Sequence, residues 1–180
     1  AAGNNSVIKP KSANKVTVRG TGEFEGNCEV ASSLAAGNIE GEEKGRIRIR
    51  GDLMVEDSIE LEKARLTVEG ELRARTVDIG NGLNVMKNLR CDSVDIGGSL
   101  EVDGDSDADN IEVGGSVALK GNLKGESVSV GGTFEVKGSA EIESLDVGGT
   151  AKIGGGTVQD IEVGGTFEST GRLSFERIGV

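Results

Sequence analysis

Residues 94–110 read Val-Asp-Ile-Gly-Gly-Ser-Leu-Glu-Val-Asp-Gly-Asp-Ser-Asp-Ala-Asp-Asn, and the same pattern begins again at Ile111. Its mark is a glycine pair followed by Ser or Thr. Five such pairs recur in the C-terminal half at spacings of 17, 17, 17 and 16 residues: Gly97-Gly98, Gly114-Gly115, Gly131-Gly132, Gly148-Gly149 and Gly164-Gly165. A strict short period of this kind indicates one supersecondary unit stacked on copies of itself.

Each copy contains three short segments in which inward and outward residues alternate. In the copy quoted above they are residues 94–96, 100–102 and 106–108. Alternation at period 2 is typical of strands, and no stretch carries the 3.6-residue period of a helix. Turn-forming residues separate the segments: a glycine pair at the first corner, a single glycine at the second and a short polar residue at the third.

Three strands and three corners in each 17-residue copy predict an all-β fold, a single-stranded triangular β-helix or solenoid of about nine coils. We call its sides the first side (residues 94–96 and their equivalents), the second side (100–102) and the third side (106–108). With four Phe and no Tyr or Trp in 180 residues, the core is expected to be narrow and aliphatic.

The chain is expected to hold one β-helix domain, residues 16–180, after a flexible N-terminal arm, residues 1–15. The pattern is broken between Leu34 and Ile47, which predicts a loop insertion near residues 35–46. Reading residues 16–30 as the first coil places Cys28 on the third side with Cys91, three coils away. That separation is about 14 Å, beyond the ~7 Å Cα limit of a disulfide, so both are interpreted as small buried hydrophobes. Unpaired thiols favour a reducing compartment.

Composition argues against several functions. The chain has no His, which removes the base of the acyltransferases and the ligands of the zinc anhydrases built on stacked coils. We therefore expect no enzyme activity, no cofactor and no metal. The formal net charge of −11 and the scarcity of aromatic residues argue against nucleic-acid binding.

The segment Asp103–Asp109 resembles the start of a calcium loop but departs from an EF-hand, because Ala108 stands where glycine is required and Gly114 where glutamate is required. It is interpreted as a solvated corner, with Asp107 between Arg90 and Lys124 of the neighbouring coils.

Outward positions of the first side are almost all acidic, and stacking should align them in a carboxylate ladder. Like charges in such a ladder repel. One interpretation is solubility and protection against lateral sheet packing; the other is a docking face for a basic partner. The residues are Glu60, Asp78, Asp95, Glu112, Ser129, Asp146 and Glu162.

The two ends of a solenoid present unpaired backbone and uncovered core. The repeat continues to the last residue without a recognisable capping element, so end-to-end stacking is expected. The predicted C-terminal interface comprises Phe167, Leu173, Phe175, Ile178 and Val180, and the predicted N-terminal interface comprises Val16, Val18 and Phe24.

Over residues 16–180 the pattern resembles the bactofilin family of polymer-forming cytoskeletal proteins. The resemblance rests on repeated units such as Val128-Ser-Val-Gly-Gly-Thr-Phe134, on the coil length and on the apolar C-terminal coil. It implies a right-handed triangular β-helix that assembles through its ends, without nucleotide, into nonpolar filaments. Family members act in the cytoplasm as scaffolds for cell-shape or membrane-associated machinery.

Two functional hypotheses follow. The first is a structural protein that polymerises with itself and contacts membrane-associated or cell-envelope machinery, in the cytoplasm or at a membrane. The alternative is a discrete β-solenoid rod that docks a partner on its acidic face. Persistence of assembly at low salt favours the first, and loss of binding with added salt favours the second.

Overall fold

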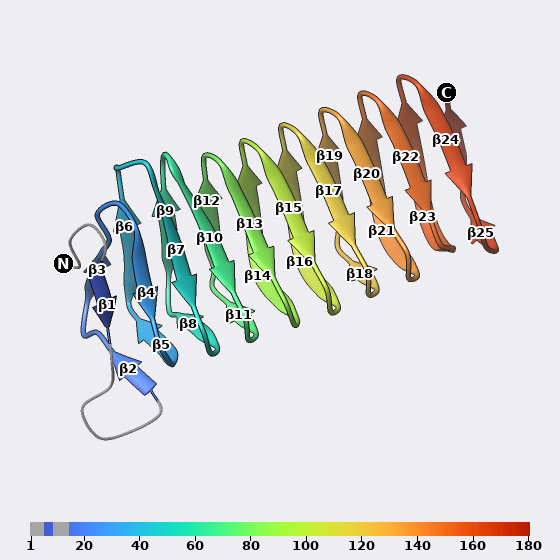
Figure 1. The fold of residues 1–180 in the computed structure, drawn as a ribbon. Helices are drawn as coiled ribbons and strands as arrows, with labels where there is room; N and C mark the ends of the chain where they lie inside the picture. The colour runs from blue at the N-terminus through green and yellow to red at the C-terminus, as the bar shows by residue number, and fades with distance from the viewer. Residues whose placement is uncertain (1–5, 9–14) are drawn as a thin grey trace.

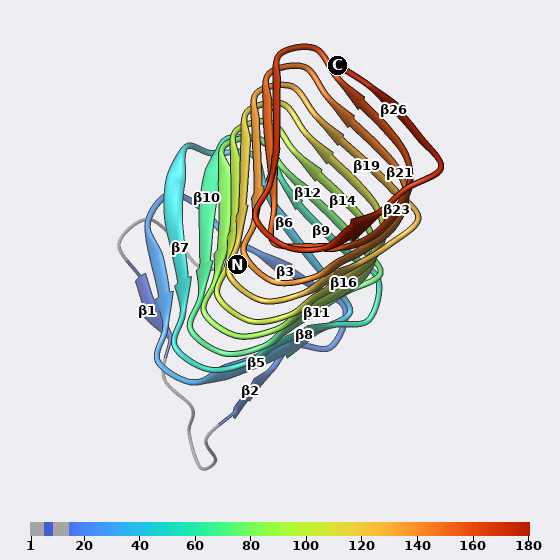
Figure 2. The same cartoon turned by 90° about the vertical axis from the view of Figure 1, so that its right-hand side faces the viewer.

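The structure is a computed structural model that describes residues 6–8 and 15–180, and it is an all-β solenoid (Figure 1). Coils follow one another along a single axis in sequence order, and each strand pairs in parallel with strands one coil away. Seen from the C-terminal end, the last coil turns counter-clockwise as the chain advances toward the viewer, so the coil is right-handed (Figure 2). The predicted β-helix is confirmed.

Ten strands of the second side form one continuous parallel sheet, which gives ten coils where about nine were expected. In spatial order they are β1 (Ser6–Ile8), β4 (Cys28–Val30), β7 (Gly45–Ile49), β10 (Ala64–Val68), β13 (Gly82–Val85), β15 (Ser99–Val102), β17 (Ser116–Leu119), β20 (Thr133–Val136), β22 (Thr150–Ile153) and β24 (Thr166–Ser169).

The third and first sides belong to one 16-stranded sheet, because four long strands bend around the third corner and contribute to both sides. The third side contains β2 (Lys15–Thr17), β5 (Ser33–Ala36), β8 (Leu53–Val55), β11 (Leu72–Arg73), the long strands β14 (Leu89–Ile96), β16 (Ser106–Val113), β21 (Ala140–Val147) and β23 (Gly156–Val163), and the short strands β18 (Leu123–Lys124) and β25 (Leu173–Ser174). Besides the long strands, the first side contains β3 (Thr21–Glu23), β6 (Asn38–Gly41), β9 (Ser58–Leu61), β12 (Thr76–Ile79), β19 (Ser127–Val130) and β26 (Arg177–Gly179).

Inward residues of all three sides form one hydrophobic core that runs along the axis. Burial alternates along the strands as the sequence pattern predicts, with Leu100 and Val102 buried on either side of exposed Glu101. Phe134, the largest fully buried side chain, takes an inward position of the second side. Within the described residues no helix is long and apolar enough to cross a membrane.

The predicted loop at residues 35–46 is wrong. This stretch completes a coil through β5, β6 and the start of β7, with Leu34 and Ile39 buried in the core. Ile39 pairs with Ile59, twenty residues later. The N-terminal coils are therefore longer than 17 residues, and the extra residues lie in corners such as residues 42–44 rather than in an insertion.

Missing this coil displaced the assignment of the coil before it. Cys28 pairs with Ile47 on the second side, whereas Cys91 lies on the third. Both thiols are free and buried, so their interpretation as small hydrophobes fits the structure although the side assigned to Cys28 does not. Of the expected flexible arm, residues 6–8 form β1 and pair with β4, residue 15 begins β2, and the rest lies outside the described residues.

Glycine at the first corner is required by the closeness of neighbouring coils. A Cβ on Gly131 would lie 2.4 Å from the carbonyl oxygen of Gly114 in the preceding coil. That distance is far below van der Waals contact, and the obstacle is backbone that cannot swing aside. The same conflict recurs at Gly148, where the nearest atom is the carbonyl oxygen of Gly131 at 2.6 Å.

We expect Gly131→Ala to destabilise the fold by about 1–3 kcal/mol, because the added methyl group must push two coils apart. Gly179→Ala is the matched control, since nothing lies within 4 Å of a Cβ at that position. Urea unfolding followed by circular dichroism compares the two. Equal midpoints would contradict the steric account.

Candidate assembly surfaces

The C-terminal coil exposes the apolar residues that other coils bury. Ile178 is 40% exposed, whereas its register partner Ile161 in the preceding coil is 3% exposed. Phe175 and Val180 are 50% and 73% exposed. Phe167 and Leu173 are half-buried and pack against the core. All five predicted residues of this interface therefore lie in the last coil, and three of them present apolar surface to solvent.

Backbone at this end also has unfilled hydrogen-bonding capacity. Within the described residues, β24 pairs only with β22, and β25 and β26 pair only with β23. Their outer edges offer N–H and C=O groups of the kind that every inner coil uses to bind the next. The end surface thus combines an exposed apolar centre with open strand edges.

The N-terminal end differs from the C-terminal end. Val16 and Val18 are half-buried against the core, as an end position predicts. Phe24 is instead 4% exposed, so its assignment to an exposed interface is wrong. Gly22 explains this burial, because Cε2 of Phe24 lies 3.7 Å from the position that a Cβ of Gly22 would take. The aromatic ring uses volume that the missing side chain leaves.

The predicted carboxylate ladder of the first side is present and continues further toward the N-terminus. Asp78 pairs in register with Glu60 on one side and Asp95 on the other. The structure adds Glu23 and Glu40, which continue the row from Glu60 and were missed because residues 35–46 were taken as a loop. The full row is Glu23, Glu40, Glu60, Asp78, Asp95, Glu112, Ser129, Asp146 and Glu162.

Electrostatic repulsion within this ladder is evident at Asp78. Partial desolvation, followed by the charges of Asp95, Glu60 and Glu62, raises the pKa of the Asp78 carboxyl. Ion pairs in the described part of the chain lie elsewhere: Arg48–Glu69 and Lys120–Asp103 are examples on the second side, and none involves a ladder carboxylate. The first side is therefore a continuous acidic surface without cations of its own.

The third side carries mixed charges, and its register confirms the interpretation of the Asp103–Asp109 segment. Asp107 lies between Arg90 and Lys124 of the adjacent coils. Asp103 forms an ion pair with Lys120 at 2.7 Å, while Asp105 accepts a hydrogen bond from the backbone N–H of Asn122 at 2.8 Å. These carboxylates point to separate partners. Among the described residues no group of acidic, Cys or His side chains is arranged to hold a metal ion.

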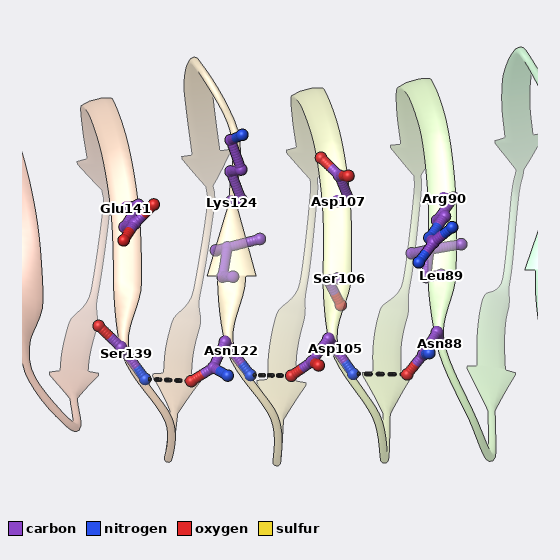
Figure 3. A pocket seen from close by; sticks show the side chains of 11 residues that line it. Asn88, Leu89, Arg90, Asp105, Ser106, Asp107, Asn122, Lys124, Ser139 and Glu141 are labelled. Carbon is purple, nitrogen blue, oxygen red and sulfur yellow. Dashed lines mark hydrogen bonds between the residues drawn. The ribbon is translucent and has the colours of Figure 1, made fainter.

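A hydrogen-bonded ladder at the second corner was not predicted from the sequence (Figure 3). Asn88 Oδ1 accepts from the N–H of Asp105, Asp105 from Asn122, and Asn122 Oδ1 from the N–H of Ser139, at 2.8–3.0 Å. The surface hollow beside it, about 360 Å³, is lined by these residues and by outward side chains of the third side. Because the ladder side chains bond to backbone, we assign them a structural role.

Cysteine reactivity is suppressed in this fold. Burial raises the pKa of Cys91 to about 12, and the nearby carboxylates of Asp92, Asp107 and Asp109 act in the same direction. The thiolate, which is the reactive form, is therefore scarce at neutral pH. Cys28 is also buried, and its thiol donates to the carbonyl oxygen of Glu25.

Comparisons with protein-family models, with curated proteins and with solved structures find no match to this chain. Its surfaces are therefore interpreted from their own geometry and chemistry.

The raised pKa of Asp78 predicts a pH-dependent stability. A carboxyl whose pKa is raised by folding stabilises the folded chain at pH below its ordinary pKa, and this contribution is lost as pH rises through the raised pKa. We expect Asp78→Asn to increase stability at pH 7 by a few tenths of a kcal/mol, and this gain to vanish near about pH 3, where Asp78 is protonated.

Glu135→Gln is the control for this prediction, because Glu135 lies between Ala118 and Lys152 and has no acidic neighbour in register. Thermal melts of both variants across this pH range provide the measurement. A gain for Asp78→Asn that persists unchanged at low pH would show that charge repulsion is not its source.

Proposed function

We propose that this chain is a structural protein that assembles end to end into nucleotide-independent filaments or scaffolds of the cytoskeletal type. The observation that carries the proposal is the last coil, where Phe175, Ile178 and Val180 are exposed at positions that inner coils bury. Burying apolar surface is favourable by roughly 25 cal/mol per Å². An end-to-end contact covers this surface and gives the open strand edges backbone partners.

The two ends are unequal, which favours a contact between two C-terminal ends as the first step. Phe24 is already buried at the N-terminal end, whereas Phe175 is half exposed at the other. A two-fold contact that joins C-terminal ends covers both apolar surfaces at once. Further contacts between N-terminal ends, where Val16 and Val18 lie, then extend the assembly into a filament without polarity.

The resemblance of the repeat to the bactofilin family supports this role. We propose accordingly that the chain acts in the cytoplasm and contacts membrane-associated or cell-envelope machinery. The role is structural rather than catalytic, which fits a chain without His whose cysteine at position 91 is held as a protonated thiol.

A second candidate function is supported by the first side. Its exposed carboxylates form no ion pair within the described residues and repel one another, as the raised pKa of Asp78 indicates. A rod with such a face is suited to docking a basic partner. Because the Debye length falls to about 3 Å at 1 M salt, this docking would weaken with salt, whereas apolar end-to-end assembly would persist.

We expect the purified chain to form filaments in negative-stain electron microscopy and Phe175→Arg to abolish them, because the substitution places charge in an apolar contact. Circular dichroism should be unchanged, since Phe175 is half exposed before assembly. Met86→Arg is the matched control: Met86 is 44% exposed, but it lies midway along the rod. Filaments that persist in Phe175→Arg, or single short rods in the wild type, would contradict the proposal.

A further inference from the structure

Two consecutive coils carry opposite charges on the two sides of the first corner. The chain reads Glu40-Gly-Glu-Glu-Lys-Gly-Arg46 in one coil and Glu60-Leu-Glu-Lys-Ala-Arg65 in the next. In both, carboxylates end the first side and cations begin the second side. The following coil turns the same corner with Gly80-Asn81-Gly82, so this acid-to-base arrangement is confined to residues 40–65.

On the basic side of the corner, Lys44, Arg46 and Arg65 line a surface hollow of about 610 Å³ together with Asn27, Gly45 and Asn81. Arg46 and Arg65 are direct register partners on β7 and β10. Like charges in this position repel. Within the described residues none of the three cations forms an ion pair, although Arg48 and Arg50 on the same side pair with glutamates.

Local structure supports the exposed position of Arg65. Its Nη2 atom lies 3.5 Å from the place that a Cβ of Gly82 would take. In later coils this register position holds Ser or Thr, as at Ser99. The glycine thus leaves room for the guanidinium beside the sheet surface, next to Arg46.

On the acidic side of the corner, a hollow of about 370 Å³ is lined by carboxylates. Glu40 and Glu60 are direct register partners on β6 and β9. The only ion pair of these side chains among the described residues joins Glu62 to Lys63 at 3.6 Å, with both side chains about two thirds exposed. The lining carboxylates are Glu23, Glu25, Glu40, Glu42, Glu43, Glu60 and Glu62.

The spacing of the two charged rows matches. Arg46 and Arg65 are one coil apart, as are Glu40 and Glu60. Both separations are set by strand pairing, which holds neighbouring strands about 4.8 Å apart. A pair of arginines on one rod can therefore meet a pair of glutamates on another rod without distortion of either.

We propose that two copies of this chain associate side by side through this corner, with Lys44, Arg46 and Arg65 of each copy facing Glu40, Glu60 and Glu62 of the other. A two-fold axis parallel to the rods brings the first side of each copy opposite the second side of the other. A two-fold axis perpendicular to the rods would instead oppose like charges. The two rods are therefore parallel and in register.

The experiment uses the Phe175→Arg background, so that lateral association is measured apart from end-to-end assembly. Sedimentation velocity at about 20 mM and about 500 mM salt should show dimers at low salt and monomers at high salt, because exposed ion pairs are screened. A basic-side variant, Lys44→Glu with Arg46→Glu and Arg65→Glu, and an acidic-side variant, Glu40→Lys with Glu60→Lys and Glu62→Lys, should each bind themselves at least about tenfold more weakly.

An equal mixture of the two variants should restore dimers, because each supplies the charge that the other lacks. The control variant Lys87→Glu, Lys124→Glu and Lys137→Glu makes the same change in net charge away from the corner and should leave pairing intact. Circular dichroism verifies that all variants are folded. Restoration in the mixture cannot come from unfolding or from net charge.

Three outcomes would overturn the proposal: monomers at low salt with the native corner, a mixture that stays monomeric, or an equal loss of pairing in the control variant. A fourth arm adds phosphatidylglycerol vesicles. Sedimentation with vesicles that requires Arg46 and Arg65, in a chain that stays monomeric, would identify a lipid-binding surface instead. Because lateral pairing does not depend on Phe175, its failure leaves the end-to-end proposal to be decided by the filament experiment alone.

Discussion

Hydrogen bonding between the backbones of successive coils is the constraint on which the rest of this structure depends. Each strand pairs with the equivalent strand one coil away, so equivalent residues stack directly on one another along the rod. Glycine at the first corner follows from this closeness, as do the apolar core rows and the carboxylate ladder. A coil in such a stack contacts only its neighbours, and an end coil lacks half of its partners. Ile161 and Ile178 show the consequence, since they occupy the same register position and differ in exposure from 3% to 40%.

Period and alternation were enough to predict the fold where the coils are regular. From Thr76 onward the register follows the 17-residue pattern, apart from the coil that reaches Ile161, which is one residue shorter. Upstream, coils of up to twenty residues keep the same three strands but lengthen their corners. A strict spacing rule therefore took residues 35–46 for a loop, although Leu34 and Ile39 are core residues. Backbone pairing tolerates longer corners as long as the strands stay aligned, and a count of residues between glycines does not capture this.

Surface features were predictable in proportion to how directly they follow from stacking. The acidic row of the first side was identified because outward positions repeat with the coil, and it was incomplete only where a coil was missed. The burial of Phe24 depends on the empty volume at Gly22, which no periodic pattern encodes. The ladder from Asn88 to Ser139 had a signal in the short polar residue after the second corner, but its hydrogen bonds depend on side-chain direction relative to the next coil.

Axial and lateral association, as proposed here, rest on opposite kinds of chemistry. The end contact buries apolar residues and strengthens with salts that are excluded from protein surfaces, whereas the corner contact relies on exposed charges that salt screens. The charge pattern also limits the lateral contact. Beyond Arg65 the first side remains acidic, but the second side no longer places cations at the corner, where Gly82 and Ser99 follow in register. Carboxylates such as Asp95 and Glu112 therefore have no cation opposite them in a parallel pair, and their repulsion opposes closer packing along the rest of the rod. Such a molecule would elongate through its ends while lateral contact stays confined to the N-terminal coils.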